Sequence, residues 1–154
     1  MGLFSFKSTK KYPIPSGDMD KIVAAIQKAE QTTSGEIRIY VESHCKYVDP
    51  LERAAEIFWS LKMDHTIDRN GVLIYIAMKD HQFAIFGDKG IYEKLGKEFW
   101  QNEVDMMSVH FRENHYIDAI QLVIHDIGQA LQEHFPFERE IDRNELPDDI
   151  IFGN

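Results

Sequence analysis

The sequence of 154 residues contains a single cysteine, no long apolar run and few basic residues. Because Cys45 has no partner in the chain, no intramolecular disulfide can form. Lys and Arg number 17 against 26 Asp and Glu, which gives a formal net charge of −9. Proteins that bind nucleic acids neutralise phosphates with clustered Lys and Arg, so the composition argues against that class of partner.

Targeting and membrane-spanning segments are also missing from the sequence. The first residues lack the apolar run of a signal peptide, and no segment approaches the length that crosses a bilayer. We therefore expect a cytoplasmic protein with no integral membrane insertion. We also expect a monomer, whose partners, if it has any, are proteins.

Several sharply defined catalytic and metal-binding motifs fail on inspection. The stretch from Thr66 begins like the calcium-binding loop of an EF-hand, but its twelfth position is Ala77 where that loop needs glutamate. No two of the 7 histidines have the i, i+4 spacing that presents both rings to zinc. Nothing supports a Ser-His-Asp triad or a glycine-rich nucleotide-binding motif. The sequence therefore offers no committed catalytic nucleophile.

Hydrophobic periodicity predicts the element order α-β-α-β-β-α-α. Asp18 is predicted to cap the first helix, and Asp49 followed by Pro50 opens the second. The first strand, Glu36–Glu42, alternates apolar and polar residues, which predicts one buried face. A continuous apolar run from Val72 predicts a central strand covered on both faces. The remaining elements are a strand at 82–86 and helices at about 91–95, 98–112 and 116–135.

This order predicts an α/β fold, a three-layer α/β/α sandwich with a small mixed β-sheet and helices on both faces. The crossover through the second helix makes the first two strands parallel, and the short turn at 79–81 makes the third antiparallel. We divide the chain into an N-terminal leader (1–17), an α/β domain (18–136) and an acidic C-terminal tail (137–154). The spaced apolar residues of the tail predict that it docks on a surface, either that of its own domain, which we favour, or that of a partner.

Four carboxylates and one arginine are the candidate site residues. The parallel pairing puts Glu36 beside the turn that contains Asp68 and Arg69, and the antiparallel third strand brings Asp88 to the same end of the sheet. Glu103, on a following helix, is a further candidate ligand. Calcium and magnesium take several oxygen ligands, which carboxylates and the carbonyls of glycine-containing turns can supply. Alternatively, Asp68 only stabilises a turn and Asp88 only caps a helix.

Short motifs distributed between about residues 20 and 150 make the chain resemble the TPM-domain family. The motifs are Thr33–Arg38, Arg69–Tyr75, Ile85–Ile91, Phe99 with Trp100, Leu131–Pro136 and Asp142–Pro147. The resemblance implies an α/β/α sandwich, and by position it implies Asp68 and Asp88 as metal ligands. Members of the family are associated with divalent-cation binding, with weak acid-phosphatase activity and with the repair or assembly of membrane complexes, including photosystem II. Many members carry a signal peptide and a membrane anchor, whereas we expect a compact member without either.

Three functions stay open at this point. The first is a divalent-cation-binding domain that acts as a protein-interaction or assembly and maintenance module, which the missing catalytic groups favour. The alternative is a weak metal-assisted acid phosphatase, in which the cation polarises a phosphoryl oxygen and Arg69 holds a phosphate oxygen. A plain scaffold role is a third interpretation. Whether the protein is an enzyme is therefore left undecided by the sequence.

Overall fold

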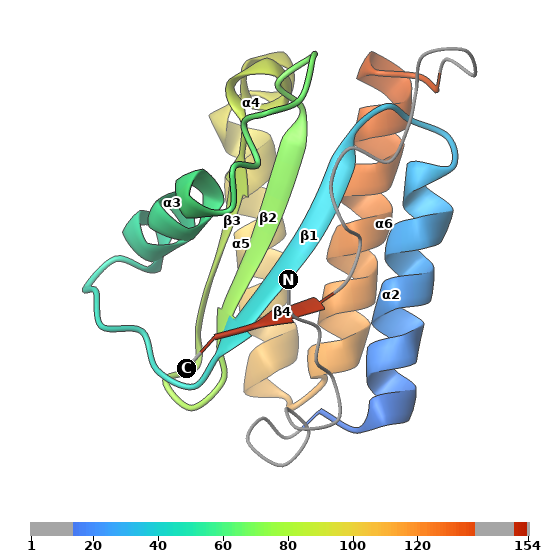
Figure 1. The fold of residues 1–154 in the computed structure, drawn as a ribbon. Coiled ribbons are helices and arrows are strands. Elements are labelled where there is room, and N and C mark those ends of the chain that lie inside the picture. Colours follow the sequence, from blue (N-terminus) through green and yellow to red (C-terminus); the bar gives the residue numbers. More distant parts are fainter. Residues whose placement is uncertain (1–13, 138–149, 154) are drawn as a thin grey trace.

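The centre of the fold is a four-stranded sheet with the strand order β3-β2-β1-β4 (Figure 1). The structure is a computed structural model that describes residues 14–137 and 150–153. The strands are β1 (Glu36–Glu42), β2 (Gly71–Ala77), β3 (Gln82–Gly87) and β4 (Ile150–Phe152). β1 pairs in parallel with both β2 and β4, and β3 pairs antiparallel to β2. The predicted mixed sheet and the relative directions of its first three strands are therefore confirmed.

Helices cover both faces of this sheet (Figure 1). They are α2 (Ser16–Glu30), α3 (Pro50–Ser60), α4 (Lys89–Leu95), α5 (Lys97–Arg112) and α6 (Tyr116–His134). The helices α2, α5 and α6 form one layer, and α3 packs on the other face against β2 and β3. The predicted α/β class with helices on both faces is confirmed. Within the described ranges, none of the helices combines the length and the apolar character that a membrane crossing requires.

The alternation of side chains along β2 explains why the protein has two hydrophobic cores. Val72 and Ile74 belong to the core beneath α2, α5 and α6, whereas Leu73 and Tyr75 belong to the core beneath α3. All residues of β2 are buried, as its continuous apolar run predicts. The central position of β2 fixes the turns at both of its ends, and the candidate site is built on one of them.

The start of α3 follows the sequence prediction. The Asp49 carboxylate accepts a hydrogen bond from the Leu51 N–H at 2.9 Å, and Pro50 occupies the first turn. This cap fixes the direction in which α3 crosses the sheet after β1.

The start of α2 differs from the prediction that Asp18 caps the helix. The helix begins at Ser16 with Pro15 at the cap position, because the Pro15 carbonyl accepts hydrogen bonds from the N–H groups of Asp18 and Met19, both at 3.0 Å. Asp18 therefore lies inside the first turn, where its negative charge still favours the helix dipole.

The polar side of β1 is also different from the prediction of one buried face. Glu36, Arg38 and Glu42 alternate with the apolar residues, yet they are only 3%, 2% and 3% exposed. Glu42 is held by Arg53, which reaches it from α3. Alternation correctly identified the two sides of the strand, but the polar side is buried as well.

Two terminal segments add to the domain beyond the predicted elements. Ile14, assigned to the leader from sequence, is 3% exposed and belongs to the larger core. The stretch Ile150–Phe152, assigned to the tail, pairs with Ile39–Val41 as β4. The other residues of the predicted leader and tail, 1–13, 138–149 and 154, lie outside the described residues.

Candidate functional site

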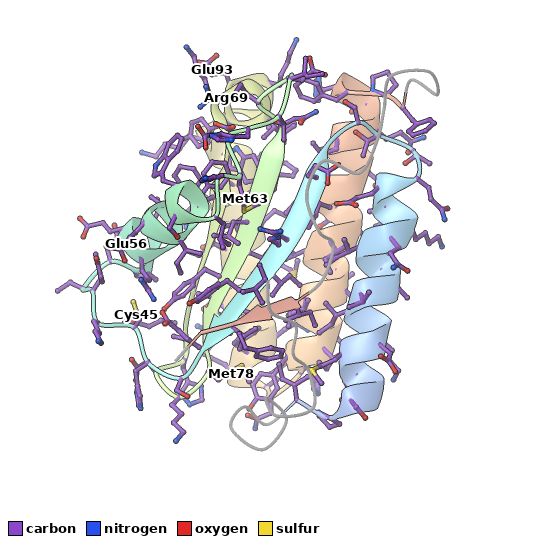
Figure 2. All side chains as sticks on the ribbon, viewed as in Figure 1. Cys45, Glu56, Met63, Arg69, Met78 and Glu93 are labelled. Carbon is purple, nitrogen blue, oxygen red and sulfur yellow. The ribbon has the colours of Figure 1, made fainter. Side chains whose placement is uncertain are left out.

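The candidate site lies at the end of the sheet where β1 and β2 begin and β3 finishes. Glu36 is in register with Gly71, and the Asp88 N–H donates to the Gly71 carbonyl at 2.9 Å. These contacts bring Glu36, the turn before β2 and Asp88 to one end of the sheet, as predicted. We call the group of Ser34, Asp68, Arg69, Asn70 and Asp88 the Asp88 end. Arg69 lies beside α4 at this end, whereas Cys45 lies toward the other (Figure 2).

Arg69 and Asp88 form a bidentate ion pair. The Arg69 Nε lies 2.8 Å from one Asp88 oxygen, and the Nη2 lies 2.9 Å from the other. One of those oxygens also accepts the Lys89 N–H at 2.7 Å, so Asp88 caps α4 as well. Hydrogen bonding to Asp88 raises the pKa of Arg69 above its ordinary value. Because Asp88 is 1% exposed and both its oxygens are bonded, a cation can reach it only if Arg69 moves away.

Gly90 lets the turn before β2 lie directly on the start of α4. A Cβ atom at this position would come within 2.2 Å of the Asp68 carbonyl oxygen and 2.6 Å of the Arg69 carbonyl oxygen. The Gly90 N–H donates to the same Arg69 carbonyl at 2.8 Å. Arg69 itself has a φ of 52°, which is an uncommon backbone conformation for a residue with a side chain. The close approach therefore fixes the turn in the conformation that points Arg69 toward Asp88.

Asn70 contributes a buried oxygen for which the described residues offer no hydrogen-bond donor. The residue is 1% exposed, and its Nδ2 donates to the Ser34 hydroxyl at 3.1 Å. That hydroxyl lies 3.5 Å from an Asp68 carboxylate oxygen and donates to it, which makes it an acceptor for the Asn70 amide group. This contact orients the Asn70 carboxamide and leaves its Oδ1 as the polar atom still to be satisfied. Among the described residues, no group donates a hydrogen bond to this oxygen.

Glu103, the fourth predicted ligand, lies in a different layer from the other three. It is on α5, where the residue is 8% exposed and its carboxyl group faces Asp126 on α6. Burial, together with the nearby Asp126, raises the pKa of Glu103 to about 8. The structure therefore brings Glu36, Asp68 and Asp88 together at one end of the sheet and leaves Glu103 between two helices.

The described part of the chain holds no group of three or more His, Cys, Asp or Glu side chains with the spacing of a metal site. The oxygen donors of the Asp88 end are of mixed kinds: the exposed carboxylate of Asp68, the amide oxygen of Asn70 and the engaged carboxylate of Asp88. Calcium and magnesium accept such mixed sets and complete their coordination with water. The donor set is thus compatible with a hard divalent cation and poorly suited to zinc, which prefers nitrogen and sulfur.

Large apolar side chains flank the Asp88 end. Trp59 is 48% exposed and Ile67, which precedes Asp68, is 83% exposed. The guanidinium carbon of Arg69 lies 6.0 Å from the centre of the Trp59 ring, at cation–π distance. The same arginine therefore contacts both the buried carboxylate and an exposed aromatic surface.

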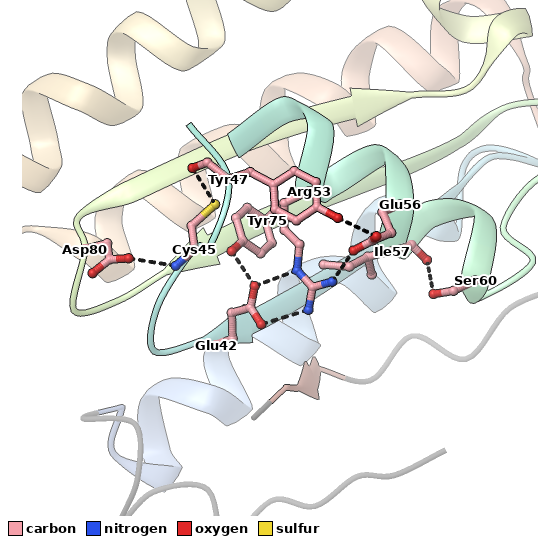
Figure 3. A network of polar contacts seen from close by, with 9 residues as sticks. All are labelled: Glu42, Cys45, Tyr47, Arg53, Glu56, Ile57, Ser60, Tyr75 and Asp80. Carbon is pink, nitrogen blue, oxygen red and sulfur yellow. Dashed lines mark hydrogen bonds and ion pairs between the residues drawn. The ribbon is translucent and has the colours of Figure 1, made fainter. Parts of the chain in front are cut away.

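A second polar network, at the opposite end of β1, was not predicted. Figure 3 shows the Glu42 carboxylate, which accepts from Arg53 Nε at 2.9 Å, from Arg53 Nη2 at 3.0 Å and from the Tyr75 hydroxyl. The third Arg53 nitrogen bonds Glu56, which also accepts from the Tyr47 hydroxyl. Burial and the bond to Glu42 raise the pKa of Tyr75. We call this group the Glu42 end.

Sequence reasoning missed Ser34 and Asn70 as parts of the site. Both occur in turn sequences, Thr-Ser-Gly and Asp-Arg-Asn-Gly, that have an ordinary backbone explanation. The available signal was the convergence of the two turns once parallel pairing of β1 and β2 is assumed. The orphaned oxygen itself depends on a contact between residues 34 and 70 and needs coordinates to be seen.

Comparisons with known proteins agree with the architecture. A family model described as the TPM domain matches residues 14–130. The NMR structure of the BA42 protein from the psychrophilic bacterium Bizionia argentinensis is similar with a TM-score of 0.82 and 37% identity, over 91% of this chain and 95% of that one. The N-terminal domain of the cg2496 protein from Corynebacterium glutamicum has a TM-score of 0.61 at 13% identity, over 90% and 80%, and so shares the fold alone. No curated protein matches.

Proposed function

The chain belongs to the TPM-domain family, and from this premise we propose that it is a divalent-cation-binding module that acts through interaction with another protein. Calcium and magnesium are the proposed cations. The Asp88 end is the proposed site, with Asp68 and Asn70 as its first ligands.

The buried oxygen of Asn70 is the observation that carries this proposal. A buried acceptor without a hydrogen bond costs about 1–3 kcal/mol, and few such atoms occur in native proteins. The Asn70 Oδ1 is one of five such side-chain atoms in the part of the chain that the structure describes, and it lies at the Asp88 end. A hard cation would satisfy this oxygen and would be neutralised by the Asp68 carboxylate, which is linked to Asn70 through Ser34.

Asp88 and Glu36 enter the proposal as secondary residues. The bidentate pair with Arg69 compensates the negative charge of Asp88, and Asp88 becomes a ligand only by releasing Arg69. Glu36 is buried at the start of β1 and adds charge at the same end. Glu103 takes no part, since it faces Asp126 in the helical layer.

An interaction role is supported by the residues around the proposed cation. Arginine and tryptophan are enriched among the residues that dominate binding energy at protein interfaces. Arg69 and Trp59 are adjacent here, and Ile67 extends the apolar surface next to Asp68. A cation that orders the Asp68–Asn70 turn would thereby order the surface that meets the partner.

The proposal is tested by titrating the full chain with calcium and with magnesium, followed by calorimetry and by amide NMR shifts. Asp68 is exposed, so Asp68→Asn removes charge without disturbing the core. We expect saturable binding by the wild type and a loss of at least about tenfold in affinity for Asp68→Asn. The matched control Asp105→Asn changes an exposed carboxylate on α5 and should bind normally. Absence of saturable binding at millimolar cation would refute the site.

The alternative, a weak metal-assisted phosphatase, is separated by an assay on the same variants. Arg69 is less available to a phosphate than its sequence position predicts, because two of its nitrogens bond Asp88. If the wild type hydrolyses a phosphate monoester at all, we therefore expect no part of that activity both to require magnesium and to disappear in Asp68→Asn. Hydrolysis that rises and falls with the cation affinity across the variants would refute the interaction module and support the metal-assisted phosphatase.

A further inference from the structure

A groove of about 650 Å³ runs between α2 and α6, in the helical layer and outside the proposed cation site. The two helices lie side by side (Figure 1). The lining extends from Lys21 to Thr32 on α2 and its C-terminal turn, which is about 16 Å of helix axis. The opposite wall comes from residues 121–132 of α6. The groove is therefore long enough for about three helical turns.

Small residues make the groove by letting the two helices approach closely. A Cβ atom on Gly128 would come within 2.8 Å of the Ala29 Cβ. Ala24 and Ala25 continue the same side of α2 along the groove. Side chains this short leave a depression between the helices, and a third helix packs into such a depression at an ordinary interhelical distance.

The charge of the groove is opposite to that of the chain. Lys21 and Lys28 line it together with His125, and the other polar lining residues are glutamines and a threonine. No carboxylate is among the lining residues that the structure describes, although the whole chain carries a net charge of −9. Asp18 lies 3.6 Å from Lys21, but the Lys21 side chain is 64% exposed and such a surface pair contributes little.

We propose that this groove docks an acidic amphipathic helix of a partner protein. The alanine-lined depression would receive the apolar stripe of that helix, and glutamate or aspartate on its flanks would meet Lys21 and Lys28. A second copy fits less well, because a symmetric dimer across the groove would place the lysines of one copy against those of the other. A lipid surface also fits less well, since the lining residues that the structure describes include none of the protruding aromatic and leucine side chains that enter membranes.

The test uses the isotope-labelled full chain and a synthetic helical peptide of about 14 residues. One face of the peptide carries alanine and leucine at i, i+3, i+4 and i+7, and its flanks carry glutamate. We expect saturable amide shifts confined to α2 and α6. Lys21→Glu/Lys28→Glu should weaken binding at least about tenfold. The control Lys79→Glu/Lys97→Glu makes the same charge change at exposed positions outside the groove and should leave the affinity within about twofold.

A second variant addresses the packing part of the proposal. Ala24 is exposed in the groove, and Ala24→Glu keeps a good helix former while it adds bulk and negative charge. It should weaken binding of the peptide at least about tenfold with unchanged thermal stability.

Four results would overturn the proposal: no saturable shifts, equal binding of a scrambled peptide, binding of anionic phosphatidylglycerol vesicles in place of the peptide, or self-association that the lysine variant abolishes. Neither Asp68→Asn nor added cation should alter the peptide affinity, so this inference stands or fails separately from the cation site.

Discussion

Two carboxylate–arginine pairs of nearly identical geometry hold the opposite ends of the sheet. In each, the Nε and Nη2 atoms of the arginine bond the two oxygens of a nearly buried carboxylate, Glu42 with Arg53 and Asp88 with Arg69. The surroundings differ. Arg53 is 25% exposed in its side chain and bonds a second carboxylate, whereas Arg69 is 41% exposed and faces Trp59.

The difference shows which pair is structural. At the Glu42 end, two carboxylates, an arginine and two tyrosines satisfy one another in a closed network (Figure 3). At the Asp88 end, the ion pair lies near the Asn70 oxygen, which has no hydrogen bond among the described residues. A polar network is most stable when every member is satisfied. We therefore assign stability to the Glu42 end and keep the Asp88 end as the proposed ligand site.

Isosteric removal of charge should separate the two pairs most clearly. Glu42→Gln leaves Arg53 and the buried Tyr75 hydroxyl with a weaker acceptor, and we expect a loss of about 3 kcal/mol in the free energy of unfolding. Asp88→Asn keeps an acceptor for the α4 cap, and the freed Arg69 can reach water, so we expect a loss of about 1 kcal/mol. Urea denaturation of both variants measures the difference. A larger loss for Asp88→Asn would reverse the assignment.

The second prediction concerns the packing that holds the Asp88 end in place. Gly90→Ala would push against the carbonyl oxygens of Asp68 and Arg69, so we expect a loss of about 2 kcal/mol and a weakened Arg69–Asp88 pair. Gly17→Ala is the matched control, because a Cβ there has nothing within 4 Å. In a helix, alanine is favoured over glycine, so the control should gain about 0.5–1 kcal/mol. Thermal denaturation checks both, and equal effects would show that the close approach is unimportant.

The fold could be predicted from the sequence wherever the pattern within one segment decides the structure. The site could be predicted only as far as strand pairing decides which residues lie close together. The apolar run of β2 and the helical stripe of α6 are signals within one segment. The convergence of Glu36, Asp68 and Asp88 followed from two pairing rules. The β4 strand has only three residues, too few for periodicity to identify.

Contacts between distant side chains account for what could not be predicted. The burial of Glu42 depends on an arginine 11 positions along the chain, and the orphaned oxygen of Asn70 depends on Ser34, 36 positions away. Alternation along a strand identifies its two sides, but it carries no information on what covers them. The same is true of Glu103, whose neighbour Asp126 is on another helix.

Glu103 extends the comparison to a buried carboxyl group whose charged neighbour, within the described ranges, is the carboxylate of Asp126. Burial and Asp126 raise its pKa to about 8 from an ordinary value near 4.5, so the folded protein binds a proton that the unfolded chain has already lost between these values. The free energy of unfolding should therefore fall as the pH rises from about 4.5 to 8. Glu103→Gln removes this dependence: at about pH 5 it should be close to the wild type, and at about pH 8.5 it should be more stable by about 4 kcal/mol, or about 8–16 °C in Tm. Val104→Ala, an apolar change at the next position, should shift stability equally at both pH values. A Glu103→Gln effect that is independent of pH would mean that the Glu103 carboxyl group is already ionised in the folded protein. In that case, burial beside Asp126 would not set Glu103 apart from the arginine-paired carboxylates Glu42 and Asp88.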